Sequence, residues 1–312
     1  MSTIDLKVKT GLSPAVWGAG VGVLFLVFVQ FFSAHSGDGT HSLVQPISGS
    51  FFEFIGHYLA YFFTQVPTLI VLGATILLYV VGTISAQSGD TTEPDLTAVM
   101  RGMLIGIGTG MNGILAYNIY GVWFGQTVGL IIGLALFVLG VISAISEVSQ
   151  SAVYQGFIGW LCWLAPMSWL VLGVGLILLV VSLVLGLVGL AGVEKLKVGG
   201  DASADPSVAG KIADANWSTG TFFLIGGLAG NFNYMPTAFD MGNVGFIHRK
   251  ADEDHTAHES GHNLSLFVFG WMIHYLGALD ENVIGYRAKA FTELLAESHA
   301  SRSGRSELEM WV

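Results

Sequence analysis

Long apolar runs without a charged residue dominate the first two thirds of the chain. Four of them are long enough to cross a bilayer core of about 30 Å as helices, which takes roughly 20 residues. They are residues 15–32, 67–84, 127–145 and 169–190. We therefore predict a mainly α protein whose larger part is a polytopic bundle of four membrane-spanning helices.

Three of the stretches between these runs are also rich in apolar residues, namely residues 51–65, 102–124 and 154–166. Each of them fits an interfacial helix, a re-entrant segment or a further span. If 102–124 and 154–166 both cross the membrane, the bundle has six spans instead of four.

The basic residues predict how the bundle is oriented, because they stay on the cytoplasmic side in short loops. All 12 Lys and Arg lie before residue 10, at Arg101 or from Lys195 onward, and the loops at 33–66 and 146–168 contain none. We therefore expect a multi-pass protein with both termini in the cytoplasm, for four spans or for six. An odd number of spans would place the two termini on opposite sides of the membrane.

The composition agrees with a membrane protein, since 53% of the residues are hydrophobic and 11% are charged. An ordinary soluble domain has about 25% charged residues, so a soluble enzyme and a disordered chain are excluded. The formal charge of −10, without a basic cluster, excludes a nucleic-acid-binding protein. The single cysteine, Cys162, excludes a disulfide framework and a metal site built from thiolates.

Glycines recur at every fourth position in two series, Gly102, Gly106 and Gly110, and Gly121, Gly125, Gly129 and Gly133. On a helix each series lines one face and lets a neighbouring backbone approach closely. The first expectation is helix packing within this chain. The alternative is that these faces dock on another copy or on a partner membrane protein.

Most charged residues follow residue 194, where the apolar runs end. Residues 195–217 are rich in Gly, Ala, Ser and Asp, which is typical of a linker. We therefore predict a transmembrane domain at 1–194, this linker, and a cytoplasmic, membrane-proximal domain at 218–312. Within that domain, residues 221–228 and 244–248 are apolar, and one interpretation is that they pair as a two-stranded hairpin. The alternative is that residues 221–228 dip into the membrane.

The most informative pattern in the C-terminal domain is His258-Glu259-x-x-His262. Acidic residues at 252–254 favour the start of a helix just before it. On a helix, positions i and i+4 face the same way, so both imidazoles reach one zinc ion at about 2.0–2.1 Å. Glu259 lies beside that face, where it can take a proton from a zinc-activated water. The pattern predicts a zinc site with Glu259 as the catalytic base.

A second helix is predicted from about Asp280 through residue 301, and it carries Glu293 and Glu297. If the first helix runs straight to about Tyr275, an antiparallel helix pair brings Glu293 level with His262 at about 20 Å from the turn. A shift of one turn brings Glu297 level with His262 instead. Either carboxylate is therefore a candidate third ligand.

The sequence His-Glu-Ser-Gly-His followed by a distant Glu-x-x-Ala-Glu resembles the gluzincin metallopeptidases, over roughly residues 251–300. The resemblance implies a zincin-like antiparallel helix pair in which His258, His262 and Glu293 bind zinc and Glu259 is the general base. It also implies that Glu297 holds His258 in the correct tautomer without touching the metal.

Other residues near the motif offer further donors. His255 and His299 are alternative metal ligands. The candidates for polarising a scissile carbonyl are Tyr234, His248, His255, His274, Tyr275 and Tyr286.

Two functions fit these observations. The leading expectation is a membrane-bound zinc-dependent metallopeptidase that hydrolyses a peptide or membrane-protein substrate near the bilayer surface. The alternative is a non-catalytic accessory subunit in which a closed metal site staples two helices together. A transporter would need more ionisable groups in mid-membrane than this chain offers.

Overall fold

The structure is a computed structural model that describes residues 14–35, 51–64, 66–88, 95–145, 151–190, 193–195, 219–228, 238–248 and 256–279. These residues are mostly helical, which confirms the expectation of a mainly α protein. They fall in two compact units. Described residues up to Ile145 and from Val268 onward belong to the first, and those from Ser151 to Phe267 belong to the second.

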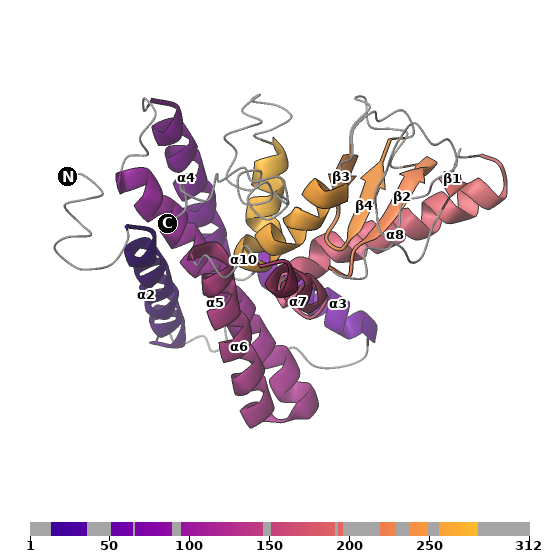
Figure 1. Ribbon diagram of the computed structural model, residues 1–312. Helices are drawn as coiled ribbons and strands as arrows, with labels where there is room; N and C mark the ends of the chain where they lie inside the picture. Colours follow the sequence, from indigo (N-terminus) through magenta and orange to yellow (C-terminus); the bar gives the residue numbers. More distant parts are fainter. Residues whose placement is uncertain are drawn as a thin grey trace. The chain divides into compact units, whose positions relative to one another are not determined.

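The first unit contains α2 (Pro14–His35), α3 (Phe51–Phe63), α4 (Val66–Ser88), α5 (Asp95–Phe124) and α6 (Gln126–Ile145). The long helix α5 packs against α2, α4 and α6 (Figure 1). It is therefore the central helix of a bundle.

Close packing of α2 on α5 depends on glycines of both helices. A Cβ atom at Gly102 would collide with the carbonyl oxygen of Ala15, and one at Gly106 with that of Ala19. On α2, a Cβ atom at Gly18 would collide with the carbonyl oxygen of Val99. This confirms helix packing within the chain for the first glycine series, whereas docking on a partner through glycine faces stays a prediction.

The second glycine series does not line one helix face, so that expectation was wrong. Gly125, with φ of 95°, forms the turn between α5 and α6, because a positive φ costs glycine no steric clash. Gly121 therefore belongs to α5, whereas Gly129 and Gly133 belong to α6 and meet the backbone of α5.

Within the described residues, three helical segments are long and apolar enough to cross a membrane, Val99–Phe124, Gln126–Ala144 and Pro166–Leu187. The last two coincide with predicted spans, and the first is a stretch for which the sequence left three alternatives. The two other predicted spans form α2 and α4, which contain the shorter apolar helical segments Pro14–Val29 and Val66–Val81. The number of crossings stays a prediction.

Two of the intervening stretches form helices that are too short to cross a bilayer. α3 has 13 residues and α7 (Ala152–Cys162) has 11, which correspond to about 20 Å and 16 Å of helix. Residues 154–166 therefore do not form a helix long enough to be one of the spans of a six-span bundle.

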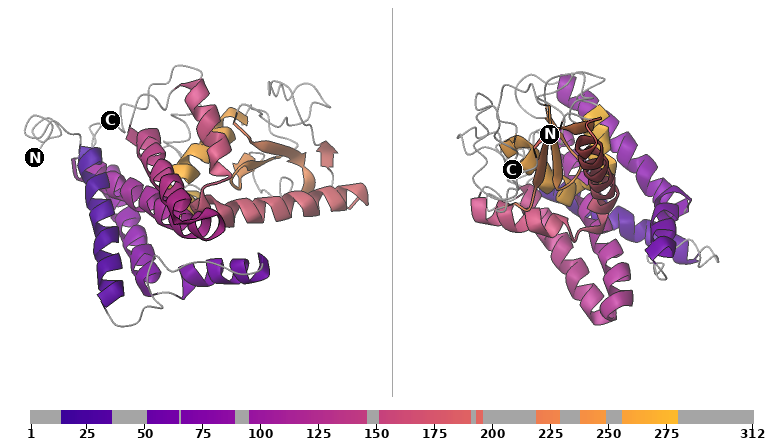
Figure 2. Two further views of the ribbon diagram at one scale, coloured as in Figure 1. Left: turned by 90° about the horizontal axis from the view of Figure 1, so that it is seen from below. Right: turned by 90° about the vertical axis from the view of Figure 1, so that its right-hand side faces the viewer.

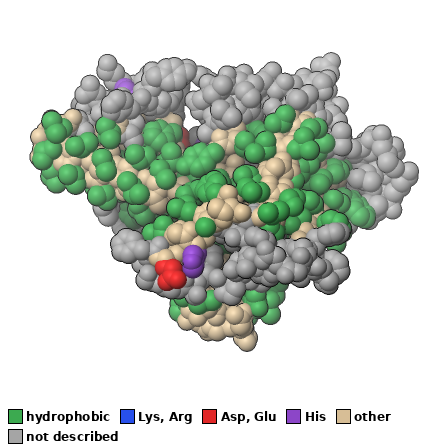
Figure 3. Space-filling model, turned by 180° about the vertical axis from the view of Figure 1, so that it is seen from behind, with side chains coloured by type: hydrophobic (Ala, Val, Ile, Leu, Met, Phe, Trp, Pro, Cys, Tyr) green, Lys and Arg blue, Asp and Glu red, His purple; other side chains and the backbone are tan. Residues whose placement is uncertain are grey.

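Large apolar side chains are exposed along the membrane-length helices. They include Leu130, Ile131, Leu134 and Val138 on α6 and Ile177, Val180, Val184 and Leu187 on α8 (Trp169–Leu187). Hydrophobic side chains also cover much of the described surface on the face shown in Figure 3. Exposed apolar area of this extent marks a surface covered by lipid or by another protein.

The second unit packs a small sheet against α8 (Figures 1 and 2). Its strands are β1 (Val193–Lys195), β2 (Phe222–Gly226), β3 (Ala238–Asp240) and β4 (Val244–Ile247), in the order β1-β2-β4-β3. The buried side chains Leu224, Val244 and Phe246 form a core with Leu172 of α8. The short 3-10 helix η3 (Pro166–Ser168) joins α7 to α8.

The predicted hairpin between 221–228 and 244–248 was wrong in its pairing. Both segments form strands, but β2 and β4 run parallel. The antiparallel partner of β4 is β3, because the chain reverses in the tight turn between them, where Gly242 has φ of 73° and the Met241 amide donates to the Val244 carbonyl. β2 then pairs with the other edge of β4. This arrangement places the end of β3 beside the beginning of β4.

Candidate metal centre

The His-Glu-x-x-His motif lies on α10 (Thr256–Leu279), which confirms the helix predicted for it. Glu259 and His262 are buried, with 3% and 5% of their surfaces exposed. His258 lies one turn before His262 on this helix, but its side chain is outside the described residues. The backbone of α10 therefore has the spacing that the predicted zinc site requires.

α10 is not straight, because Gly270 has φ of 73° and ψ of 179° within it. This backbone region is essentially restricted to glycine. The expectation of an uninterrupted helix to Tyr275 was therefore wrong, and with it the straight-helix distances that brought Glu293 or Glu297 level with His262.

The kink has a direct consequence for two histidines of α10. On a straight helix His262 and His274, twelve residues apart, would be separated by about 18 Å along the axis. Instead, one ring nitrogen of each lies within 4.8 Å of the other. Gly270 lies between the two histidines, so the separation expected for a straight helix does not apply to them.

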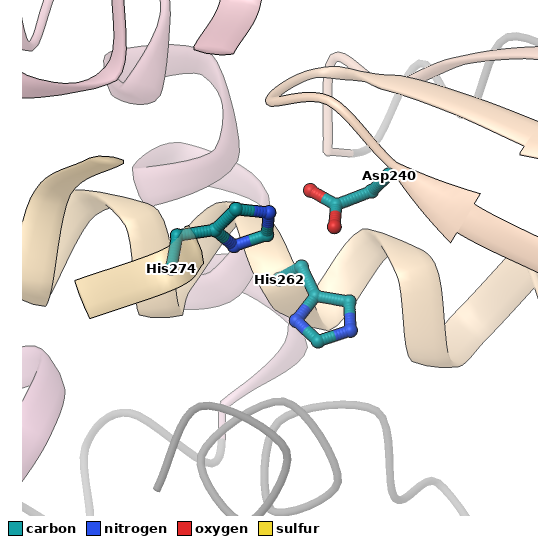
Figure 4. A group of neighbouring side chains, drawn as sticks. All are labelled: Asp240, His262 and His274. Atoms are coloured by element: carbon teal, nitrogen blue, oxygen red, sulfur yellow. The ribbon is translucent and has the colours of Figure 1, made fainter. Parts of the chain in front are cut away.

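Asp240, the last residue of β3, completes a group of three. One carboxylate oxygen of Asp240 lies within 4.8 Å of the ring nitrogens of both His262 and His274. Figure 4 shows the carboxylate directed toward the two histidine rings. All three side chains are buried, with 6%, 5% and 7% of their surfaces exposed.

The donor set of this group fits a divalent transition metal. Two imidazole nitrogens and one carboxylate oxygen are ligands that zinc accepts, and three protein ligands leave a fourth tetrahedral position for water. Buried ionisable groups are costly unless they are paired or coordinate a metal. The residue types, their closeness and their burial are therefore compatible with a metal site.

The hairpin of β3 and β4 fixes the position of Asp240. Asp240 pairs with Gly245 across the hairpin, and the rings of Phe239 and Phe246 stack at a centroid distance of 5.1 Å. The turn begins directly after Asp240. The carboxylate therefore projects from a strand end that is paired within the sheet.

Asn263, which follows His262, connects α10 to the beginning of β2. Its buried amide nitrogen donates to the Thr221 hydroxyl and to the Thr219 carbonyl. The side-chain amide of Asn243 donates to the carbonyl oxygens of Gly159 and Gly220, at 2.8 and 3.1 Å. The Asn263 bonds hold the part of α10 that carries His262 beside the beginning of β2, and the Asn243 bonds hold the beginning of β4 on α7 and on the segment before β2.

Cys162 lies close enough to Asp240 to sense its charge. Burial raises the pKa of the Cys162 thiol to about 12, a hydrogen bond with the Ser168 hydroxyl at 3.2 Å opposes this, and the negative charge of Asp240 adds to it. The thiol therefore stays protonated at neutral pH, where a metal ligand would need to be a thiolate.

The remaining predicted site residues are distributed as follows. His255, Glu293, Glu297 and His299 lie outside the described residues, as do Tyr234 and Tyr286. His248 follows β4 and is half-buried, and Tyr275 is at the surface of α10. The role of each of these residues stays a prediction.

Asp240 was missed by the sequence analysis, and His274 was considered only for polarising a carbonyl. One sequence signal could have identified Asp240, since it is the only acidic residue between Asp214 and Asp252 and follows an apolar pair, Ala238-Phe239. No pattern in the sequence indicates the backbone conformation of Gly270, which lies between His262 and His274.

Comparison of the chain with known proteins finds no matching family model, no matching curated protein and no matching solved structure. The function is therefore inferred from the chemistry of the site itself.

Proposed function

We propose that this protein is a membrane-bound zinc-dependent metallopeptidase. The observation that carries the proposal is the convergence of Asp240 and His274 on His262, the second histidine of the His-Glu-x-x-His motif. A motif of this length occurs by chance in many proteins. Two further buried donors beside it make a chance match a poor explanation.

Zinc is held in this proposal by His262, His274 and Asp240. His258 lies one turn before His262 on α10, and this i, i+4 spacing makes it a further candidate ligand. The set inferred from the sequence, His258, His262 and Glu293, shares His262 with it. His262 is therefore the ligand common to both sets.

Zinc, when bound, lowers the pKa of a coordinated water toward about 7. Glu259 lies three residues before His262 on α10, and so within one turn of it. Its carboxylate acts as the general base that accepts a proton from the attacking water and passes it to the leaving amine. The burial of Glu259 keeps bulk water away from this proton transfer.

The substrate in this proposal is a peptide segment close to the bilayer. The membrane-length helices keep the chain in the membrane, and the second half of α10 packs into the helical bundle. A multi-pass arrangement with both termini in the cytoplasm, which requires an even number of crossings, is part of the proposal.

One observation favours a second candidate, a metal site that only stabilises the structure. Asp240, His262 and His274 are each more than 90% buried, as the ligands of a closed structural site would be. In that case the protein is an accessory membrane subunit whose metal connects α10 to β3.

Replacement of Glu259 tests the peptidase. We expect Glu259→Gln to retain zinc but to lose hydrolysis of peptide substrates by about 10²–10⁴-fold, because the amide cannot accept the proton. The assay uses the purified full chain in phospholipid vesicles, with zinc content measured on the same samples. His57→Ala, which removes an exposed histidine of α3, is the control and should retain both properties.

Hydrolysis by Glu259→Gln at the wild-type rate would contradict the role of Glu259. A wild-type protein that holds zinc but cleaves no peptide would contradict the peptidase and support the structural site.

A further inference from the structure

The short helix α3 has three distinct faces. Phe54, Tyr58 and Phe62, at successive fourth positions, form the face that is turned into the protein. The side chains of Ile55, Leu59 and Phe63 form a neighbouring apolar face that is exposed, at 38%, 37% and 53%. Two faces of this helix are therefore apolar, and among the described residues one is turned inward while the other is exposed.

The third face of α3 is polar and exposed. It contains Glu53 and His57, which are four residues apart and so lie one above the other, together with Thr64 just after the helix. A span through the hydrocarbon core would place this charged face in lipid, which is costly. A helix in water would leave the second apolar face exposed to solvent.

The inward face of α3 is anchored on aromatic residues of the first unit. The Phe54 ring lies 5.6 Å from that of Trp123, at the end of α5, and the Phe62 ring lies 5.3 Å from that of Trp271 of α10. Tryptophan and tyrosine side chains are enriched where a membrane meets water. These contacts place α3 at the end of a membrane-length helix.

The exposed apolar face of α3 continues into α4. After α3 ends at Phe63, α4 begins at Val66, and its Leu69 and Ile70 are exposed in turn. Within the bundle α3 does not run alongside α2 and α5 but is turned away from their direction (Figures 1 and 2). The exposed apolar surface of α4 therefore extends onto one side of α3.

We propose that α3 is an interfacial helix that lies in the headgroup region of the bilayer. Its face of Ile55, Leu59 and Phe63 is embedded in lipid, its face of Glu53 and His57 is in water, and its third face is held by Trp123 and Trp271. With 13 residues it is too short to span but long enough to lie in the membrane plane. The inference rests on the membrane placement in the proposed function and is independent of the zinc chemistry.

Site-directed fluorescence quenching tests this placement. Single cysteines at Ile55→Cys, Leu59→Cys, Glu53→Cys and His57→Cys carry an environment-sensitive fluorophore, in the full chain reconstituted in phosphatidylcholine–phosphatidylglycerol vesicles. All four positions are exposed, so labelling leaves the core intact. The native Cys162 is buried, and its pKa is raised to about 12, so the wild-type chain should take up no label and serves as the blank.

We expect labels at positions 55 and 59 to lose quenching by aqueous iodide. Lipids brominated close to the headgroup should quench these labels more than lipids brominated at the chain ends, since an interfacial helix is buried by about 5–10 Å. Labels at positions 53 and 57 should keep quenching by iodide and show none from either lipid.

Leu77→Cys on α4, where the side chain is 64% exposed, is the control for membrane placement and should be quenched by lipid alone. Equal iodide quenching at all four α3 positions would overturn the proposal by placing α3 in water. Equal quenching of all four by deeply brominated lipid would overturn it by placing α3 in the core. If Leu77→Cys is quenched by iodide, the membrane placement itself fails and the interfacial helix with it.

Discussion

Asp240 is the residue that most changes the interpretation of the motif. The sequence pattern predicts that the carboxylate ligand follows the motif, at Glu293 or Glu297. In the structure, the carboxylate that lies close to His262 is that of Asp240, which precedes the motif. An aspartate at a strand end is positioned by the register of the hairpin. Its role therefore depends on a pairing that local sequence does not reveal.

Replacement of single carboxylates distinguishes the ligand set that contains Asp240 from the set that contains Glu293. We expect Asp240→Asn to lose most of its zinc, because the amide removes the charged donor while keeping the shape of the side chain, whereas Glu293→Gln retains zinc. Zinc per chain, measured by elemental analysis after dialysis, reports both. Loss of zinc from Glu293→Gln with full retention in Asp240→Asn would instead support the ligand set inferred from the sequence.

At the scale of the element, α10 combines a motif that the sequence predicts with a kink that it does not. The helix follows from the acidic start and the apolar continuation, and it was predicted correctly. The kink depends on Gly270, whose φ of 73° becomes visible only in the folded backbone. A glycine within an apolar helical run is compatible with either a straight or a bent helix.

Gly270→Ala tests the kink. Alanine at this conformation costs about 1–3 kcal/mol, so we expect a lower unfolding temperature. If the helix straightens to relieve the strain, His274 moves away from His262 and zinc is lost. Zinc content and thermal unfolding in detergent are measured together.

The matched control is Gly73→Ala on α4, where an added Cβ atom would meet no atom within 4 Å. Alanine is also the better helix former, so this variant should keep its stability and its zinc. If Gly270→Ala behaves like the control, the kink does not hold the site together.

At the scale of the whole molecule, the sequence predicts the helices that are formed by long apolar runs, but not the contacts between distant segments. Helices at all four predicted spans follow from uninterrupted hydrophobicity, which is a local property. The parallel pairing of β2 with β4 and the convergence of Asp240 with His262 and His274 are non-local. They depend on tight turns and on long-range contacts, which a pattern of apolar and polar positions does not encode.

The aromatic contacts also connect the interfacial helix to the proposed site. Trp271, which packs on Phe62 of α3, precedes His274 by three residues on α10. If α3 marks the level of the headgroups, His274 lies within one helical turn of that level. This is the depth at which a peptide segment leaving the membrane would pass.

Zinc content of the purified full chain is the most direct test of the metal site. We expect about one zinc ion per chain in the wild type and in the control His57→Ala, and close to none in His262→Ala, because His262 belongs to both candidate ligand sets. Equal zinc in the wild type and in His262→Ala, with both proteins folded, would contradict the site and the peptidase built on it.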